Sequence, residues 1–309
     1  MADPALKALI AKREIILAPG VYDLISALIA DRMGFNALYV TGYGTVASHL
    51  GLPDAGLATY SEMVDRIAQI AKMTKTPIIA DADTGYGGLL NVRHTVRGYE
   101  AAGVTAIQLE DQEFPKKCGH TPNRRVIQTE DMIDKIKVAT DSRSSADFLV
   151  IARTDSRTTL GLDEALRRGA AYAKAGADIV FIESPESEAE LAEIARRIDA
   201  PVMANMVEGG RTPILSGPKL QEMGYAVAIF PAIGFLATAQ ALETAYGDLR
   251  DNGKSTGRAP LYSFADFNTL IGFPDVWDFE KRYAKVEVPP PPAPSPHTTE
   301  PAPPKKRGR

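Results

Sequence analysis

One pattern repeats along residues 15–231 and restricts the fold more than any other feature. A short run of β-branched and apolar residues is followed by a polar or glycine-rich corner and then by a stretch with helical spacing. Eight such runs are predicted as strands: Ile15–Ala18, Ala37–Thr41, Pro77–Asp81, Ala106–Glu110, Phe148–Arg153, Ile179–Glu183, Val202–Asn205 and Ala226–Phe230. Strands that alternate with helices are parallel, because a parallel connection needs a crossover element. Eight units favour a closed (β/α)8 barrel, an α/β fold, with an open doubly wound sheet as the alternative.

The helical stretches carry their own boundary signals. Gly161 precedes the helical stretch Ala165–Ala175, and Gly176 follows it. After the eighth strand, Phe235–Leu249 is predicted as one helix and Phe264–Tyr283 as further helical or irregular structure. We therefore expect one domain over residues 1–287, a barrel with C-terminal helices.

The composition changes from residue 288 onward. A proline-rich run over residues 289–294 leads to a basic end over residues 305–309. Such a segment cannot bury apolar area, so we expect a disordered tail over residues 288–309. Nuclear localisation or polyanion binding by the basic end is the alternative.

Composition and charge exclude several classes of protein. The net charge of −4 provides no basic surface for nucleic acid. No apolar run approaches the roughly 18 residues that a membrane helix needs. The single cysteine cannot form an internal disulfide, and no secretory signal is recognisable near Met1. We expect a cytoplasmic protein with neither nucleic acid nor membrane as a partner.

Polar residues follow the predicted strands at their C-terminal ends. In a barrel of this type the active site lies at those ends. The polar strand ends are Asp81 to Gly88, Glu110-Asp111, Arg153-Thr154-Asp155, Glu183-Ser184 and Asn205. Glu183 and Asn205 taken singly could be structural hydrogen-bonding residues, but the set together indicates a ligand.

The spacing of Asp81 and Asp83 indicates a metal site. Residues two apart on a strand point to the same face, and Glu110 ends the next strand. Converging carboxylates repel one another unless a cation lies between them, and oxygen ligands favour Mg²⁺ or Mn²⁺ over zinc. The alternative is that these acids cap loops or pair with Arg93 and Arg97.

Cys118 lies on a polar loop after the fourth strand, between two lysines and His120. Cationic neighbours lower a thiol pKa and favour a reactive cysteine, whereas a bystander surface cysteine is the alternative. One cysteine and four histidines in the chain argue against a zinc site.

Two further features suit a carboxylate ligand. Arg153 can hold a carboxylate through two parallel hydrogen bonds, or can pair instead with Glu183 or Asp155. The segment from Thr41 to Thr45 offers backbone N–H groups at two glycines, and its spacing matches neither the dinucleotide nor the P-loop pattern. A plain turn is the alternative for this segment.

Four motifs together resemble the isocitrate lyase and phosphoenolpyruvate mutase superfamily over residues 5–285. They are Asp81-x-Asp83-Thr84-Gly85-Tyr86-Gly87, Glu110-Asp111-Gln112, Lys116-Lys117-Cys118-Gly119-His120 and Arg153-Thr154-Asp155. The cysteine motif marks the lyase branch, because the mutases and phosphonopyruvate hydrolases lack it. Within that branch the chain is similar to the 2-methylisocitrate lyase, 2,3-dimethylmalate lyase and petal-death protein group.

The resemblance implies roles for individual residues. Asp83 would hold Mg²⁺ directly, and Asp81, Asp54 and Glu110 would hold it through water. The other implied roles are substrate binding by Thr41, Gly42, Tyr43, Gly119, Arg153, Glu183, Asn205 and Thr212, and acid catalysis by Cys118 with Lys117 and His120 beside it. Tyr43 or a metal-bound carboxylate would be the base. Dimers with swapped C-terminal helices, assembled into tetramers, are also implied.

The expected reaction is Mg²⁺-dependent cleavage of the C2–C3 bond of a 2-hydroxydicarboxylate, of the 2,3-dialkylmalate or 2-methylisocitrate type, to a 2-oxo acid such as pyruvate and a carboxylic acid. Gln108 stands where methylisocitrate lyases commonly carry His, and residues 205–213 resemble the dimethylmalate lyase and petal-death versions more. The resemblance therefore implies that the extra carboxymethyl group of methylisocitrate is bound poorly. The alternatives are hydrolysis of oxaloacetate to oxalate and acetate, or a non-catalytic scaffold whose proline-rich tail recruits partners.

Overall fold

The computed structural model describes residues 3–121 and 123–283 and contains a closed barrel of parallel strands. The strands are β1 (Ile16–Val21), β2 (Leu38–Val40), β3 (Ile78–Asp81), β4 (Ala106–Glu110), β5 (Leu149–Thr154), β6 (Ile179–Ile182), β7 (Val202–Asn205) and β8 (Val227–Phe230). They pair in chain order, and β8 returns to pair with β1 through Ile16 and Val227. The predicted (β/α)8 barrel is therefore confirmed, and the open sheet is excluded.

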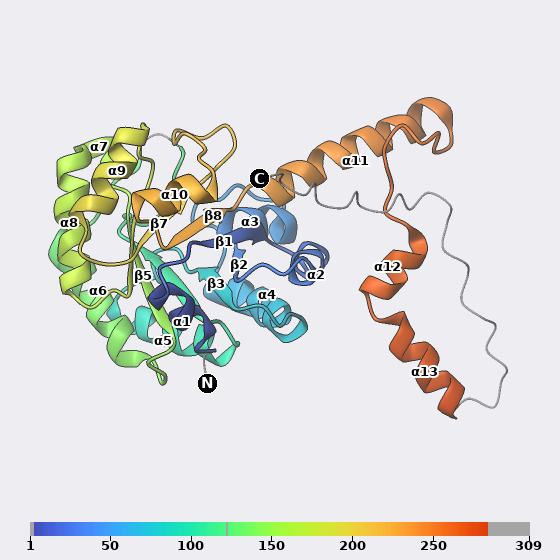
Figure 1. Ribbon diagram of the computed structural model, residues 1–309, viewed down its shortest axis with the longest axis horizontal. Coiled ribbons are helices and arrows are strands. Elements are labelled where there is room, and N and C mark those ends of the chain that lie inside the picture. The colour runs from blue at the N-terminus through green and yellow to red at the C-terminus, as the bar shows by residue number, and fades with distance from the viewer. Residues whose placement is uncertain (1–2, 122, 284–309) are drawn as a thin grey trace, which may run out of the picture. The chain divides into compact units, whose positions relative to one another are not determined.

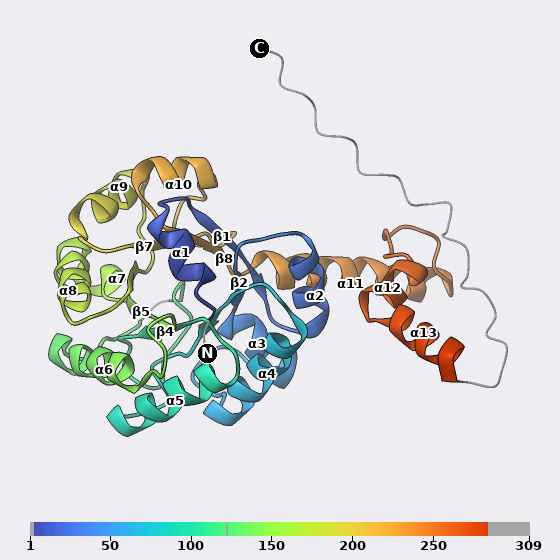
Figure 2. The same cartoon turned by 60° about the horizontal axis from the view of Figure 1, so that its bottom comes forward.

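The helices that connect successive strands surround the barrel, as Figures 1 and 2 show, and further helices precede β1 and follow β8. They are α1 (Ala5–Ala11), α2 (Leu24–Arg32), α3 (Gly42–Leu50), α4 (Tyr60–Met73), α5 (Leu89–Ala101), α6 (Thr129–Ser142), α7 (Arg157–Leu160), α8 (Leu162–Lys174), α9 (Glu188–Arg197), α10 (Gly217–Met223), α11 (Ile233–Asn252), α12 (Phe264–Leu270) and α13 (Phe273–Tyr283). Side-chain caps fix several of their starts. Thr59 and Glu62, for example, form a capping box at the start of α4.

The predicted boundaries hold closely. All eight predicted strands are present, and β4 and β7 match their predicted ranges. The segment Phe264–Tyr283, for which helical or irregular structure is predicted, forms two helices, α12 and α13. Gly272 lies between them with φ of 94°, a left-handed conformation that ends the first helix at low cost because glycine has no Cβ.

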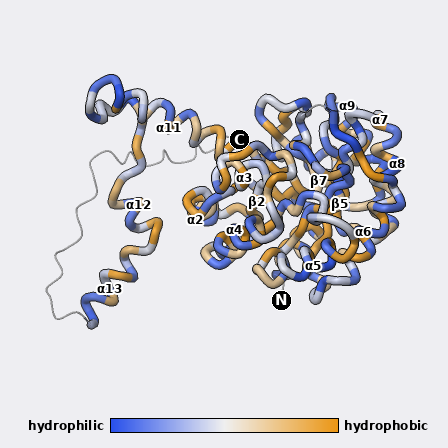
Figure 3. Tube along the Cα trace, turned by 180° about the vertical axis from the view of Figure 1, so that it is seen from behind, coloured by the Kyte–Doolittle hydropathy of each residue, from blue (hydrophilic) through white to orange (hydrophobic). Residues whose placement is uncertain are grey.

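Two apolar layers hold the barrel together. Alternate strand residues, such as Ile79, Ile151 and Phe181, pack against one another inside the barrel, and Leu6 of α1 belongs to the same cluster. The intervening residues face outward against the helices. The strands carry much of the apolar sequence, as the hydropathy colouring in Figure 3 shows. Because side chains alternate along a strand, the interior row continues directly into the residues at each strand end.

The chain divides into two compact units, with the boundary between Thr238 and Ala239 inside α11. The first unit contains the complete barrel. The described part of the second unit holds the end of α11, then α12 and α13, and Asp248 accepts hydrogen bonds from the backbone N–H and hydroxyl of Thr256 within it. The predicted tail, residues 288–309, lies outside the described residues. No helix in the described part of the chain is long and apolar enough to cross a membrane.

Candidate active site

The strand ends of the barrel surround a cavity of about 220 Å³. Strand alternation brings the predicted residues there, because each lies two positions after a side chain of the interior row. The pairs are Tyr39 and Thr41, Ile79 and Asp81, Gln108 and Glu110, Ile151 and Arg153, Phe181 and Glu183, and Met203 and Asn205; the second member of each lines the cavity. The predicted convergence of the strand ends is thus seen in the structure.

Asp81 and Asp83 come together by a different route from the predicted one. β3 ends at Asp81, and Asp83 has a left-handed φ of 49°, so the two do not share a strand face. A turn joins them instead, in which the Asp83 N–H donates to Asp81 Oδ1 at 3.1 Å. Gly42 leaves room for the cluster, since a Cβ there would lie 2.7 Å from Asp81 Oδ2.

Lys116 places a cation among the carboxylates. Its Nζ donates a hydrogen bond to Asp54 Oδ1 and lies 2.5 Å from Asp83 Oδ1, with its side chain 4% exposed. Asp83 and Asp54 raise the pKa of Lys116 well above its ordinary value, against the opposing effect of burial. The ion pair of Asp83 is therefore with Lys116 rather than with Arg93 or Arg97, and sequence reasoning gave Lys116 no role.

The carboxylate cluster fits a divalent cation by two observations. Glu110 Oε1 is a buried oxygen without a hydrogen bond among the described residues, and Asp83 Oδ1 has no partner there besides the Lys116 ammonium. Burial, ahead of the neighbouring charges, raises the pKa of Asp83 to about 7 and that of Glu110 well above its usual range. Additional positive charge would stabilise both carboxylates.

The cluster is nevertheless not a ready-made cage. No group of three or more His, Cys, Asp or Glu side chains within the described ranges is arranged to hold a metal ion. Mg²⁺ commonly takes only one or two carboxylates directly and keeps several waters, so a single direct ligand such as Asp83 remains compatible with this geometry.

Gln108 lies beneath the site and is fully buried. It accepts a hydrogen bond from the Tyr39 hydroxyl at 3.2 Å, and its amide donates to Asp81 Oδ1 at 3.4 Å. Gln108 does not line the cavity itself, but both of its partners do, so any influence of Gln108 on substrate choice acts through the orientation of Tyr39 or Asp81.

Arg153 is held mainly by an ion pair. Its Nε and Nη2 donate to the two oxygens of Asp155 at 2.9 and 2.8 Å, and it lies 3.3 Å from Glu110 and 3.4 Å from Glu183. The pair of parallel hydrogen bonds predicted for a ligand thus goes to Asp155. Arg153 still lines the cavity, and its Nη1 pairs with Glu110 rather than with Asp155.

Cys118 lines the same cavity, but the predicted lowering of its pKa is wrong. Burial raises the pKa of the thiol to about 11, and the charges of Asp54 and Glu183 add to this effect. A hydrogen bond from the backbone of His120 and the charge of Arg153 oppose it only in part. At neutral pH the side chain is a protonated thiol, which suits a proton donor and not a nucleophile.

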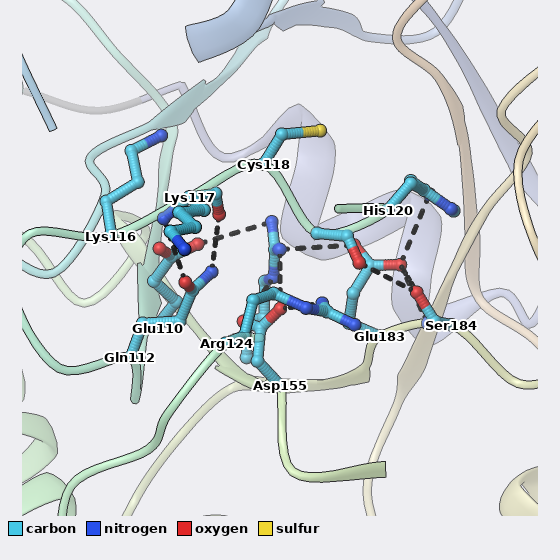
Figure 4. Close-up of polar contacts among 12 residues, drawn as sticks. Glu110, Gln112, Lys116, Lys117, Cys118, His120, Arg124, Asp155, Glu183 and Ser184 are labelled. Carbon is cyan, nitrogen blue, oxygen red and sulfur yellow. Dashed lines mark hydrogen bonds and ion pairs between the residues drawn. The ribbon is translucent and has the colours of Figure 1, made fainter. Parts of the chain in front are cut away.

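The loop that carries Cys118 is fastened at several points (Figure 4). The side-chain amide of Gln112 donates to the Lys117 carbonyl at 2.8 Å and accepts from the Lys117 N–H at 3.0 Å. The Ser184 hydroxyl donates to the Gly119 carbonyl at 3.0 Å. A Cβ at Gly119 would lie 2.3 Å from Arg153 Nη2, so the loop can approach the barrel this closely only with glycine there.

His120 links this loop to the ends of β6 and β7. Its Nε2 lies 3.5 Å from Glu183 Oε1 and 3.4 Å from Asn205 Nδ2, and its Nδ1 accepts from the Arg211 N–H at 3.3 Å. Burial lowers the pKa of His120 from 6.5, so the ring is mainly neutral at pH 7. Lys117 lines the cavity with an exposed side chain.

The segment from Thr41 to Thr45 is neither a loop nor a plain turn. It begins α3, with Thr41 as the N-cap residue. The first N–H groups of a helix have no partner within the helix, so this end suits an anion. Thr41 and Tyr43 line the cavity, and the Tyr43 ring stacks on Phe235 at 5.2 Å.

The remaining predicted residues differ in their placement. Glu183 is fully buried and accepts a hydrogen bond at 3.0 Å from Asn205, whose Oδ1 has no hydrogen-bond partner among the described residues. Thr212 is buried without lining the cavity, and the same is true of Asp83 and Gly42. Sequence reasoning missed Glu208, which lines the cavity and has a buried Oε2 without a hydrogen bond. It also missed the apolar wall formed by Val207, Ile229, Pro231, Ala232, Phe235 and Leu236.

A barrel with a buried carboxylate cluster, an arginine and a thiol at its strand ends defines a class of enzymes that act on small carboxylates. Comparison with known proteins agrees with this class. The family model for phosphoenolpyruvate phosphomutase matches residues 6–250, and the chain belongs to this family, within the phosphoenolpyruvate mutase and isocitrate lyase superfamily.

Two lyases are among the most similar relatives. The chain is 46% identical to 2,3-dimethylmalate lyase of Eubacterium barkeri, over 90% of this chain and 97% of that one. It is 44% identical to a 2-methylisocitrate lyase of Aeropyrum pernix, over 91% of this chain and 90% of that one.

Solved structures agree with the sequence relatives. A 2,3-dimethylmalate lyase structure matches with a TM-score of 0.86 at 34% identity, covering 93% of this chain and all of that one. Oxaloacetate acetylhydrolase with 3,3-difluorooxalacetate matches with a TM-score of 0.85 at 33% identity, over 90% and 95% of the two chains. Phosphonopyruvate hydrolase with oxalate and Mg²⁺ matches with a TM-score of 0.82 at 29% identity, over 92% and 100%.

Proposed function

We propose that this chain is a Mg²⁺-dependent carbon–carbon lyase that cleaves a 2,3-dialkylmalate to a 2-oxo acid and a carboxylic acid. The observation that carries the proposal is the protonated thiol of Cys118 in a cavity that the buried carboxylates Asp54, Asp81 and Glu110 also line. Identity of 46% to a 2,3-dimethylmalate lyase over nearly the whole of both chains supports the same reaction.

The metal would be held by Asp83 directly and by Asp81, Asp54 and Glu110 through water. When bound, Mg²⁺ would acidify the substrate hydroxyl and stabilise the oxygen of the forming carbonyl. A base, Tyr43 or a carboxylate of the cluster, takes the hydroxyl proton. The electron pair of the C2–C3 bond then remains on C3 as an aci-carboxylate.

Residues around the loop would complete the reaction. Cys118 gives its proton to C3, which yields the carboxylic acid product and leaves a thiolate to be reprotonated. The N–H groups at the start of α3 would bind the pyruvate-like half together with Arg153, whose Nη1 pairs with Glu110 at 3.3 Å and does not contact Asp155. Glu183 and Asn205 would hold the other carboxylate end together with the closed loop.

The wall of the cavity favours an alkyl substituent over a third carboxylate. Six apolar residues form one side of it, and its acidic lining residues are Asp54, Asp81, Glu110, Glu183 and Glu208. Of the lining cations, Lys116 and Arg153 already pair with carboxylates of the protein. The remaining lining lysine, Lys117, is exposed, so an added carboxymethyl group, as in 2-methylisocitrate, would be desolvated without a buried cation to pair with.

Oxaloacetate hydrolysis is the second candidate, because the fold matches an oxaloacetate acetylhydrolase as closely as it matches the lyase. A turnover panel of 2,3-dimethylmalate, 2-methylisocitrate and oxaloacetate separates the reactions. We expect pyruvate release from 2,3-dimethylmalate to give the highest kcat/KM. Oxalate release from oxaloacetate as the fastest reaction would instead assign the hydrolase.

We further propose that the chain forms a homotetramer. Large apolar side chains of the second unit are exposed, among them Leu261 at 69%, Phe264 at 77% and Phe279 at 64%. Exposed apolar surface of this kind commonly marks a protein interface. Light scattering during size-exclusion chromatography should give about four times 33.2 kDa, whereas a monomer mass would contradict the proposal.

A further inference from the structure

Lys116 shares its carboxylate partners with the proposed metal. Its ammonium contacts Asp54 and lies 2.5 Å from Asp83, and its side chain is almost completely removed from solvent. Asp83 is also the residue proposed to bind Mg²⁺ directly. One protein cation and one metal cation therefore depend on the same buried oxygens.

The same contacts connect Lys116 to Cys118. Asp54 binds this loop twice, since its carboxylate accepts from Lys116 and its backbone carbonyl accepts from the Cys118 N–H at 3.2 Å. The segment around Asp54 also packs tightly against the loop, because a Cβ at Gly56 would lie only 3.2 Å from the backbone nitrogen of Lys116. A change in the pairing of Lys116 therefore acts on the segment that positions Cys118.

Two cations at one buried cluster repel each other, and the repulsion is stronger there than in water. If the ammonium weakens metal binding, the metal weakens the ammonium contacts by the same factor, because coupling between two binding equilibria is reciprocal. Loosening those contacts would loosen the loop.

We propose that Lys116 is a resident counter-cation of the carboxylate cluster that couples metal binding to the position of the Cys118 loop. It lowers the affinity for the metal and fastens the loop, and Mg²⁺ binding releases the loop in part. The inference rests on the proposed metal site, but it assigns Lys116 a positioning role that the lyase reaction does not require.

Calorimetric titration with MgCl₂ tests the first half of the proposal. Lys116→Met keeps most of the side-chain volume and removes the charge, so we expect about tenfold tighter Mg²⁺ binding than in the wild type. Lys116→Arg keeps the charge and should bind Mg²⁺ with affinity near that of the wild type. Lys117→Met is the matched control, because it removes a neighbouring exposed charge that solvent already screens, and its Mg²⁺ affinity should be unchanged.

Alkylation of Cys118 by iodoacetamide tests the second half. The chain has a single cysteine, so intact mass reports the reaction at this residue alone. In the wild type and in Lys117→Met, saturating MgCl₂ should raise the alkylation rate by about fivefold. In Lys116→Met the rate should be high without Mg²⁺ and insensitive to it. The wild-type comparison remains decisive if Lys116→Met does not fold.

The outcomes separate this inference from the proposed function. Three results would each overturn the coupling while leaving the metal site intact. The first is Mg²⁺ binding by the wild type with unchanged or weaker affinity in Lys116→Met, and the second is an equal gain in Mg²⁺ affinity in Lys117→Met. The third is a wild-type alkylation rate that does not change when Mg²⁺ is added. If neither the wild type nor Lys116→Met bound Mg²⁺, the metal assignment and the coupling would both be wrong.

Discussion

Cys118 shows how the chemistry of one side chain depends on which neighbours reach it in space. The ammonium of Lys116 is directed to Asp54 and Asp83, and Lys117 has an exposed side chain. The two adjacent lysines therefore do not offset the effect of burial on the thiol pKa. The result is a thiol that keeps its proton at neutral pH, as a general acid requires.

Replacing this thiol should remove turnover and leave the fold intact. We expect Cys118→Ser to lower kcat by at least about 100-fold, because general acid catalysis typically contributes a factor of that size and a hydroxyl is a much weaker acid than a thiol. Steady-state kinetics and circular dichroism check the two halves. An unchanged kcat in a folded variant would remove Cys118 from the mechanism.

The pKa of Cys118 also fixes the sign of one pH dependence. The competent form is protonated and the pKa is about 11, so this group should cause no loss of activity between pH 7 and 9. Activity should then fall as the pH rises toward 11 and the proton is lost. The rate of alkylation should rise over the same alkaline range, because iodoacetamide reacts with the thiolate. An alkylation midpoint near pH 7 would contradict the buried thiol.

At the scale of elements, the loop after β4 and the start of α3 both line the cavity at the strand ends. Gly119 lies against Arg153 and Glu183, and a Cβ there would be 2.3 and 2.7 Å from their polar atoms. We expect Gly119→Ala to displace the loop, to lower kcat by at least about tenfold and to speed the alkylation of Cys118, with little change in Tm. Small displacements of catalytic groups commonly have effects of this size.

Gly88 supplies the matched control for this substitution. It has φ of −79°, and nothing lies within 4 Å of a Cβ built there. Gly88→Ala should therefore leave kcat and the alkylation rate near the wild-type values. Equal effects of the two substitutions would show that the loop does not depend on close approach at Gly119.

The sequence alone predicts those residues of the site whose positions follow from the alternation of side chains along a strand. Four residues continue the row of side chains that point into the barrel: Glu110, Arg153, Glu183 and Asn205. Because side chains on a strand alternate with a period of two residues, this pattern brings the four together. Contacts that depend on loop geometry could not be obtained in this way. Asp83 reaches the cluster through a left-handed turn, and no local pattern indicates this.

Other parts of the site depend on contacts distant in the chain. Lys116 meets Asp54 across 62 positions, and Phe235 of α11 stacks on Tyr43 of α3. Neither contact has a periodic signal in the sequence. The pairing of Arg153 with Asp155 could not be predicted for a different reason. An arginine at a strand end can form its two parallel hydrogen bonds either with a ligand or with a carboxylate of the protein.

At the scale of the whole molecule, the barrel explains the chemistry and the second unit bears on assembly. All residues that line the cavity belong to the first unit. The exposed apolar residues of α12 and α13 are consistent with the proposed tetramer and have no evident role in the reaction.

The most direct test of the lyase assignment is the release of pyruvate from 2,3-dimethylmalate, measured with MgCl₂ and again after removal of divalent metal with a chelator. We expect equimolar pyruvate and propionate with MgCl₂, loss of turnover in chelator, and recovery on adding MgCl₂ back. Turnover that persists in chelator would contradict the metal site. No pyruvate from this substrate under either condition would contradict the assignment as a dialkylmalate lyase.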